Sequence, residues 1–311
     1  VAYIPGKGLI ASTSMDRRIH LWDSMTGRSI YQMPIHDCMI NCIVASHDGS
    51  VLVTADEKGR IQFWDPVRRT LESTIDPHSG SVHALAISPD DGMLAAAGED
   101  RKITLWDLAS NQSKGVLEGH EETITDLEFS RDGRTLLSSS RDDTIRIWNP
   151  MSGALERTLE STAHDFMSIA INPASDQVAS GTIDGQILLW DEDGELQQLH
   201  HHDQAVTCLE FNPAGTELYS GSNDGLICRW DPGDGRLIDE SIHDAPVSSI
   251  AIDHEQNRGA VGYEDRMIRV YALARPELVK QLTGPRSEVL STALHPGGNL
   301  LATGHGDDII R

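Results

Sequence analysis

Apolar and polar positions alternate on either side of a short polar turn in the segment 136–149, which reads LLSSSRDDTIRIWN. A run of apolar and small residues precedes the turn, and Ile145, Arg146 and Ile147 alternate after it toward Trp148. Alternation with a period of two is typical of strands that bury one face. The segment is therefore predicted to form a β-hairpin.

The same pattern occurs seven more times along the 311 residues. The aromatic residues that close seven of the hairpins lie 42, 42, 42, 42, 40 and 41 residues apart, at Trp22, Trp64, Trp106, Trp148, Trp190, Trp230 and Tyr271. Spacing this regular indicates an internal repeat. In the fourth copy, an inner strand at 124–129 and an outer strand near 155–159 flank the hairpin. One such unit cannot bury both of its faces, so neighbouring units are expected to stack.

The repeat resembles that of the WD40 family, because Asp follows the closing tryptophan in five copies, after Trp22, Trp64, Trp106, Trp190 and Trp230. The resemblance covers the chain from end to end. It implies an all-β propeller in which each repeat forms one four-stranded blade.

The repeat count predicts how the blades divide the chain. Within one propeller at 1–311 we expect blades at 1–35, 36–77, 78–119, 120–163, 164–201, 202–242, 243–283 and 284–311, the last incomplete. A single eight-bladed ring is favoured, and the alternative is part of a tandem propeller array. No second domain is expected, and the chain is expected to be a fragment of a longer one.

Composition narrows the classes of partner. The net charge of −23 disfavours nucleic acid and anionic membranes and favours a basic peptide or protein face, unless the acidity serves only to keep a β-rich surface soluble. No stretch approaches eighteen apolar residues, and no leader pattern opens the chain. Cys38, Cys42, Cys208 and Cys228 are too few and too scattered for a disulfide framework, which indicates reduced thiols in the cytoplasm.

The WD40 resemblance also implies a structural role for many of the histidines. The family links a histidine, a strand serine, the hairpin-turn aspartate and the tryptophan by hydrogen bonds. Three repeats contain the complete tetrad: His120, Ser138, Asp142 and Trp148; His164, Ser180, Asp184 and Trp190; and His202, Ser220, Asp224 and Trp230. Repeats two, three and seven depart from it at Lys58, Ala96, Val261 and Tyr271, so their blades are expected to be less rigid.

No enzyme is expected. A tetrad contains Ser, His and Asp, but a catalytic triad needs one nucleophile in one pocket, and three copies at a repeat spacing serve no such purpose. The sequence has no phosphate loop, HExxH, paired CxxC or GxSxG motif. His200, His201 and His202 alternate in direction on an extended chain, so together they predict no metal site. We therefore expect neither metal nor cofactor.

The expected function is a protein-interaction scaffold. The resemblance places the residue before the turn aspartate, and residues just after the histidine, on the partner-binding top face. The candidates are Met15, Met39, Glu57, Glu99, Glu121, Arg141, Phe166, Ile183, Asn223 and Glu264. This acidic set with a few apolar members suits a basic segment beside an apolar anchor. The alternatives are a sensor module fused to an effector domain and, less favoured, an enzyme that uses the channel mouth.

Overall fold

The computed structural model describes residues 1–13, 17–23, 28–33, 37–160, 165–191, 193–194, 196–253, 258–265, 267–272, 277–283, 289–294 and 301–305. All regular elements in these ranges are strands. Over the same ranges, no helical segment has the length and hydrophobicity that crossing a bilayer requires. The chain divides into two compact units, Val1–Glu160 and Ser161–Arg311.

The first unit contains four antiparallel sheets of four strands, each formed by consecutive strands. These blades are β1 (Ala2–Ile4), β2 (Leu9–Thr13), β3 (Ile19–Asp23) and β4 (Ser29–Gln32); β5 (Ile40–Ala45), β6 (Leu52–Asp56), β7 (Ile61–Asp65) and β8 (Thr70–Ile75); β9 (Val82–Ile87), β10 (Met93–Gly98), β11 (Lys102–Asp107) and β12 (Ser113–Glu118); and β13 (Ile124–Phe129), β14 (Leu136–Ser140), β15 (Thr144–Asn149) and β16 (Ala154–Glu160).

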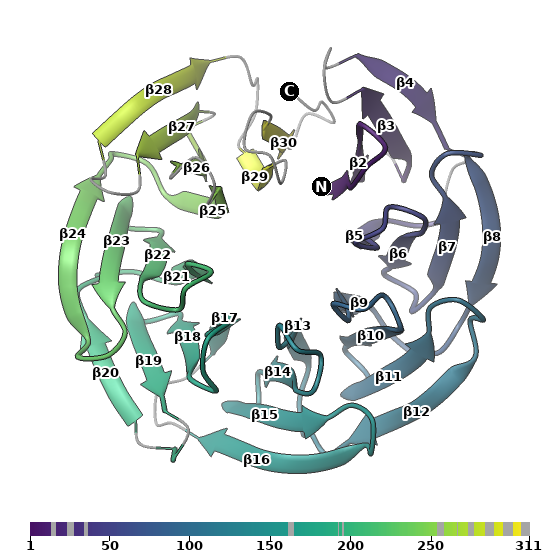
Figure 1. Ribbon diagram of the computed structural model, residues 1–311, viewed down its shortest axis with the longest axis horizontal. Helices are drawn as coiled ribbons and strands as arrows, with labels where there is room; N and C mark the ends of the chain where they lie inside the picture. Colours follow the sequence, from purple (N-terminus) through teal and green to yellow (C-terminus); the bar gives the residue numbers. More distant parts are fainter. Residues whose placement is uncertain are drawn as a thin grey trace. The chain divides into compact units, whose positions relative to one another are not determined.

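The second unit contains three further four-stranded blades and a two-stranded sheet among its described residues. The blades are β17 (Phe166–Ile171), β18 (Val178–Thr182), β19 (Gln186–Trp190) and β20 (Leu196–His200); β21 (Val206–Phe211), β22 (Leu218–Ser222), β23 (Leu226–Asp231) and β24 (Arg236–Ile242); and β25 (Val247–Asp253), β26 (Arg258–Tyr263), β27 (Met267–Ala272) and β28 (Glu277–Thr283). The two-stranded sheet pairs β29 (Val289–Leu294) with β30 (Leu301–His305). Figure 1 labels the strands of each unit.

The prediction of a single eight-bladed ring is wrong, because the described residues form seven four-stranded blades. Among the described residues, the eighth repeat contributes only the β29–β30 hairpin. The sequence pattern counts hairpins, whereas a blade needs three strand pairings. The number of hairpin repeats in the sequence is therefore one greater than the number of four-stranded blades among the described residues.

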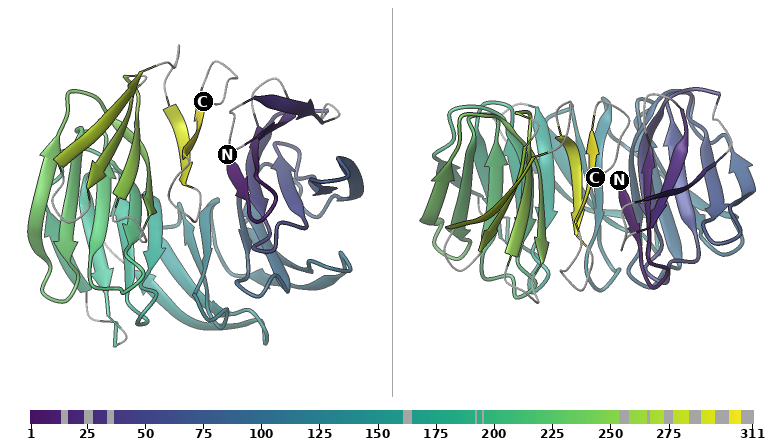
Figure 2. Two further views of the ribbon diagram at one scale, coloured as in Figure 1. Left: turned by 45° about the horizontal axis from the view of Figure 1, so that its top comes forward. Right: turned by 90° about the horizontal axis from the view of Figure 1, so that it is seen from above.

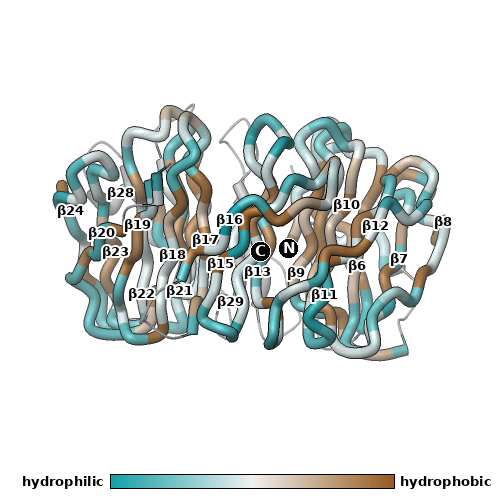
Figure 3. The backbone as a smooth tube through the Cα atoms, turned by 90° about the horizontal axis from the view of Figure 1, so that it is seen from below, coloured by the Kyte–Doolittle hydropathy of each residue, from teal (hydrophilic) through white to brown (hydrophobic). Residues whose placement is uncertain are grey.

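Blade four shows how the sequence pattern becomes a blade. In β14 every residue is buried, whereas β16 is mostly exposed. The small serines of β14 suit a strand that is covered on both faces, and the alternation in β15 suits a strand covered more on one face. Figure 2 shows the strands of one blade running side by side. In Figure 3 the hydrophobic colour lies along strands such as β6 and β17.

Neighbouring blades within each unit are held together by shared apolar clusters. In the first unit, Ile103 and Leu105 of blade three pack in one cluster with Leu127, Leu136 and Trp148 of blade four. In the second unit, the first strands of the three blades, β17, β21 and β25, and β29 of the two-stranded sheet contact one another in that order. The closing tryptophan is thus buried where two blades meet, as stacking requires.

Candidate functional site

The predicted tetrad of blade four is continuous in the structure. Asp142 Oδ2 lies 2.8 Å from His120 Nδ1, and His120 Nε2 lies 2.7 Å from Ser138 Oγ. Trp148 Nε1 donates to the same Ser138 oxygen over 2.8 Å. Asp142 also accepts from the Glu121 amide, which ties the blade to the loop after the histidine. Burial opposes ionisation of Asp142, but hydrogen bonds from His120 and Thr144 outweigh it and lower the pKa of the carboxyl.

Blade six repeats the same geometry. His202 Nδ1 lies 3.1 Å from Asp224 Oδ2, and His202 Nε2 lies 2.8 Å from Ser220 Oγ. Trp230 Nε1 donates to Ser220 Oγ over 2.9 Å. Burial lowers the pKa of His202, although Asp224 pulls it upward. The His202 ring is therefore held in its neutral form.

The third predicted tetrad is only partly visible. His164 lies outside the described residues. The buried Ser180 hydroxyl has no hydrogen-bond partner among the residues that the structure describes. Asp184 accepts instead from Thr182 Oγ1 and, over 2.7 Å, from Gln186 Nε2, and Trp190 is buried.

Blade three replaces the missing serine with a residue from the next strand. Ala96 pairs in register with Thr104, and Thr104 Oγ1 lies 3.0 Å from His78 Nε2. His78 Nδ1 lies 2.9 Å from Asp100 Oδ1. The buried Trp106 Nε1, however, has no partner within the described part of the chain. The hydrogen-bond network of blade three is thus complete around His78 but lacks the link to the Trp106 indole.

Blade two shifts its turn carboxylate by two residues. Asp56, fully buried at the end of β6, accepts from the amides of Lys58 and Arg60 through Oδ1. Thr54 takes the place of the serine, with its Oγ1 accepting from Trp64 Nε1 at 3.1 Å. Sequence reasoning noted the absence of aspartate at Lys58 and missed Asp56, although its position ahead of the turn was visible in the sequence.

Blade seven builds a different network from tyrosines. Tyr271 OH is hydrogen-bonded to His243 Nε2 and lies 2.8 Å from Tyr263 OH. The Arg269 guanidinium lies over the Tyr263 ring, 4.3 Å from its centroid, and pairs with Asp265. Sequence reasoning missed Tyr263, whose signal was a tyrosine two residues beyond Val261 on the same strand. The lower rigidity expected for blades two, three and seven stays a prediction.

The two kinds of predicted binding position are the residue before the turn aspartate and the residues just after the histidine. They lie next to each other on the loop face, which is the end of each blade that contains the turn between its second and third strands, such as the β6–β7 turn. In each described pair, the amide of the residue before the turn aspartate, or its counterpart, donates to a carbonyl shortly after the histidine position, three residues after it in five pairs and one residue after it at Asp165. The pairs are Glu57 with Met39, Glu99 with Ser81, Arg141 with Thr123, Ile183 with Asp165, Asn223 with Ala205 and Glu264 with Pro246. Backbone hydrogen bonds therefore fix both kinds of position together.

Most of the candidate residues are exposed, with one clear exception. Glu57, Glu99, Glu121, Arg141 and Glu264 are exposed, as are Met39 and Ile183, and Asn223 is half-buried. Phe166 is instead buried, with its ring edge-on to Trp190 at 6.2 Å, so its assignment to an exposed binding surface is wrong. Its strand position points it into the blade rather than to the loop face. Met15 lies outside the described residues.

Charge on the loop face differs between the units. In the first unit, Arg60 pairs with Asp37 over 2.6 Å, and the basic residues Lys58, Arg101 and Arg141 are exposed beside the glutamates. Among the described residues of the second unit, the exposed charges just after the histidine and before the turn aspartate are carboxylates, at Asp165, Asp203, Asp244 and Glu264. Arg266, the counterpart of Arg101, lies outside the described residues. Among the described residues, acidic character is therefore less offset by basic side chains in the second unit.

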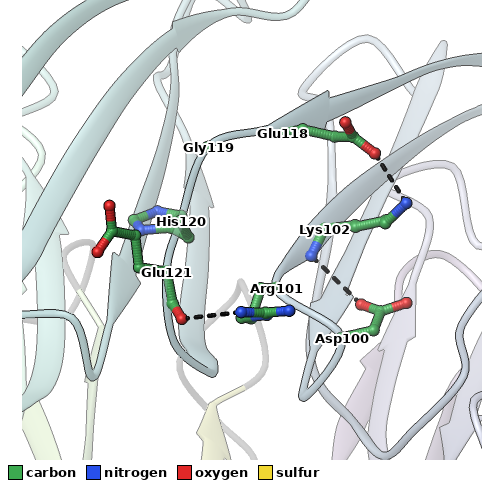
Figure 4. A pocket seen from close by; sticks show the side chains of 7 residues that line it. All are labelled: Asp100, Arg101, Lys102, Glu118, Gly119, His120 and Glu121. Atoms are coloured by element: carbon green, nitrogen blue, oxygen red, sulfur yellow. Dashed lines mark hydrogen bonds and ion pairs between the residues drawn. The ribbon is translucent and has the colours of Figure 1, made fainter.

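A shallow cleft of about 560 Å³ opens between blades three and four of the first unit. Figure 4 shows the side chains that line it. Lys102 Nζ pairs with Glu118 over 2.7 Å, and Arg101 Nη1 donates to the Glu121 carbonyl at 3.2 Å. Both cations are engaged by the chain itself, and the lining mixes the two signs of charge. The cleft thus offers no convergent set of polar groups of the kind that an active site needs.

Comparison with known proteins identifies the same repeat. The IFT122 first beta-propeller matches residues 39–311, and the WD domain, G-beta repeat, matches residues 1–23. The prediction of WD40 repeats is confirmed. No curated protein matches the chain.

Among solved structures, the crystal structure of the computationally designed Ika8 protein is similar, with a TM-score of 0.88 and 23% identity. The alignment covers 99% of this chain and 94% of that one. At this identity the likeness concerns the fold alone.

Proposed function

Because the chain belongs to the IFT122 first beta-propeller family, we propose that it is a non-enzymatic scaffold whose acidic loop face binds basic segments of protein partners. WD40 propellers typically serve as protein-interaction platforms. The observation that carries the proposal is the set of exposed carboxylates Asp165, Asp203, Asp244 and Glu264 at the loop positions of the second unit, together with the exposed Ile183, whose amide donates to the Asp165 carbonyl. Carboxylates on the same face as an exposed apolar residue complement a Lys- or Arg-rich segment with one apolar anchor. We place the protein in the cytoplasm, in accord with its four free cysteines.

The net charge of −23 supports a protein partner over nucleic acid or an anionic membrane, because phosphates would be repelled. The rigid backbone pairing of the loop positions supports a preformed binding surface, which loses little conformational entropy when a partner binds.

The test compares two triple variants that remove the same charge. Asp203 and Asp244 are changed to Asn and Glu264 to Gln on the loop face of the second unit, and Glu72 and Glu156 are changed to Gln and Asp176 to Asn at exposed positions away from the loop face. Binding of synthetic peptides that alternate Lys or Arg with Leu is followed by fluorescence anisotropy at two salt concentrations. We expect the loop-face variant to bind about tenfold more weakly, roughly 1.4 kcal/mol, with a smaller dependence on salt.

The control variant should change affinity much less, because the strand register places Glu72, Glu156 and Asp176 at the end of the blades opposite the loop face. Equal weakening in both variants would mean that net charge alone attracts the peptide. Unchanged affinity and salt dependence in the loop-face variant would refute the proposed surface.

A further inference from the structure

Three metal-ligating side chains meet beside blade six, outside the loop-face positions. They are His201, directly after β20; Cys228, in β23; and Glu240, in β24. One ligand atom from each lies within 4.8 Å of the others. His201 Nε2 is hydrogen-bonded to Glu240 Oε2, and the His201 ring stands edge-on to Trp230 with centroids 6.1 Å apart.

The fold itself brings these three positions together. Cys228 and Glu240 are register partners on neighbouring antiparallel strands, so their side chains share one face. In blade four the equivalent register pair is Arg146 and Thr158. A Cβ at Gly119, the counterpart of His201, would lie 2.1 Å from Arg146 Nη1. The same three positions are therefore adjacent in blade four, where they hold residues that are not metal ligands.

Blade six is distinctive in what occupies these positions. At the position of Cys228, the other described blades carry His20, Gln62, Thr104, Arg146, Leu188 and Arg269. The combination of His, Cys and Glu at one such place is seen in blade six, among the residues that the structure describes. The blade architecture does not require it, because blade four closes the same tetrad without it.

We propose that His201, Cys228 and Glu240 form a site for a divalent transition-metal ion, with Zn²⁺ the best match. An imidazole nitrogen, a thiolate sulfur and a carboxylate oxygen are the ligand types that Zn²⁺ accepts, and Cys together with His disfavours Mg²⁺ and Ca²⁺. Tetrahedral Zn²⁺ needs donor atoms roughly 3–4 Å apart, which small side-chain rotations would achieve from the observed spacing. His201 and Glu240 are exposed, so water would supply the fourth ligand.

Binding would be coupled to protonation and to the tetrad. Burial, then the Glu240 and Asp224 carboxylates, raise the pKa of the Cys228 thiol, and a bound cation would reverse that effect. The thiol would lose its proton to solvent as the metal–sulfur bond forms. Cys228 pairs in register with Ser220, so the site would adjoin the His202 tetrad.

This site differs from the histidine cluster that the sequence emphasises. It uses one member of 200–202, which agrees with the alternation of side chains along an extended chain. Its other two ligands lie 27 and 39 residues further along the sequence, at Cys228 and Glu240. Only the strand register joins them, so no local motif announces the site.

The test titrates the intact 311-residue chain with Zn²⁺ by calorimetry in a non-coordinating buffer, and with Co²⁺ as a spectroscopic probe. We expect one ion per chain, a near-ultraviolet thiolate-to-Co²⁺ charge-transfer band, release of a proton, and a higher melting temperature with Zn²⁺. Cys228→Ser should abolish the band. His201→Gln and Glu240→Gln alter exposed side chains, so both should fold normally and bind Zn²⁺ about tenfold more weakly or less well still.

His200→Gln and Cys208→Ser are the matched controls, because they remove a neighbouring histidine and another thiol of the same blade. Both should keep the Co²⁺ band and the Zn²⁺ affinity. Absence of the band in the wild-type protein, or a band that survives Cys228→Ser, would overturn the proposal. Equal weakening by His200→Gln and His201→Gln would show nonspecific surface binding and would overturn it as well.

Discussion

The Ser138 hydroxyl fixes the direction of every hydrogen bond in its tetrad. Because indole can only donate, Trp148 Nε1–H points to Ser138 Oγ, and the serine proton must go to His120 Nε2. His120 then carries its proton on Nδ1 and donates it to Asp142. Each member thus has a partner, and the lowered pKa of Asp142 reflects the donors that surround it.

Asp142→Ala should destabilise the protein by about 1–3 kcal/mol, because His120 Nδ1–H and the amides of Glu121 and Thr144 lose a shared acceptor. Chemical denaturation followed by tryptophan fluorescence measures the change. The neighbouring Arg141→Ala, at an exposed position, serves as the control and should cost less than about 0.5 kcal/mol. Unchanged stability in Asp142→Ala would contradict a structural role for the tetrad.

At the level of the blade, the sequence predicted the strands and the tetrads best where the residue at the expected position itself makes the expected hydrogen bond. Alternating positions and regular spacing located the strands, and two of the proposed tetrads have the hydrogen bonds that their residues suggested. It failed where another strand supplies the missing group, as Thr104 does for Ala96. A motif read along the chain contains no information on cross-strand partners, which depend on register.

The burial of Phe166 and the blade count failed for related reasons. Phe166 sits one position past the exposed Asp165, and a single step along a strand reverses the direction of a side chain. The eighth repeat matched the hairpin pattern, yet it provides a two-stranded sheet in the described residues. Both errors came from equating a match to the pattern with a position in three dimensions.

Blade three offers a direct test of the cross-strand replacement. Ala96→Ser would place a hydroxyl where Ser138 and Ser220 accept from Trp148 and Trp230. It would therefore give an acceptor to Trp106 Nε1, which has no partner among the described residues. We expect stabilisation by roughly 0.5–1.5 kcal/mol in urea denaturation.

Ala95→Ser is the control for blade three, because Ala95 lies in the apolar cluster shared with blade four. A hydroxyl there has no partner in the cluster and should destabilise by about 1–3 kcal/mol. If the two serine variants had equal stability, Trp106 would not be the group that gains from the substitution at Ala96.

Across the whole molecule, we expect the titration of a few buried and half-buried groups to limit the pH range of greatest stability. Burial lowers the pKa of His202 and of His243, and the positive Arg269 lowers that of His243 further. These rings bind protons less readily in the folded state than in the unfolded chain. Their contribution is fully present above about pH 6.5, the unfolded value, and is lost as the pH falls below it.

Glu210 acts in the opposite direction, so we expect it to limit stability on the alkaline side. Burial raises its pKa from 4.5 to about 8, so its contribution is fully present below pH 4.5 and is lost as the pH rises through 8. Glu210→Gln removes the buried charge, and the melting temperature of this variant relative to wild type should therefore increase between pH 5 and pH 9. Glu264→Gln, which removes one exposed carboxylate from a chain of net charge −23, is the matched control for the change in total charge. A constant difference in melting temperature between Glu210→Gln and wild type across this range would show that Glu210 ionises as readily in the folded protein as in the unfolded chain. Any loss of stability at alkaline pH would then have to come from repulsion among the surface carboxylates. Added salt would relieve that repulsion.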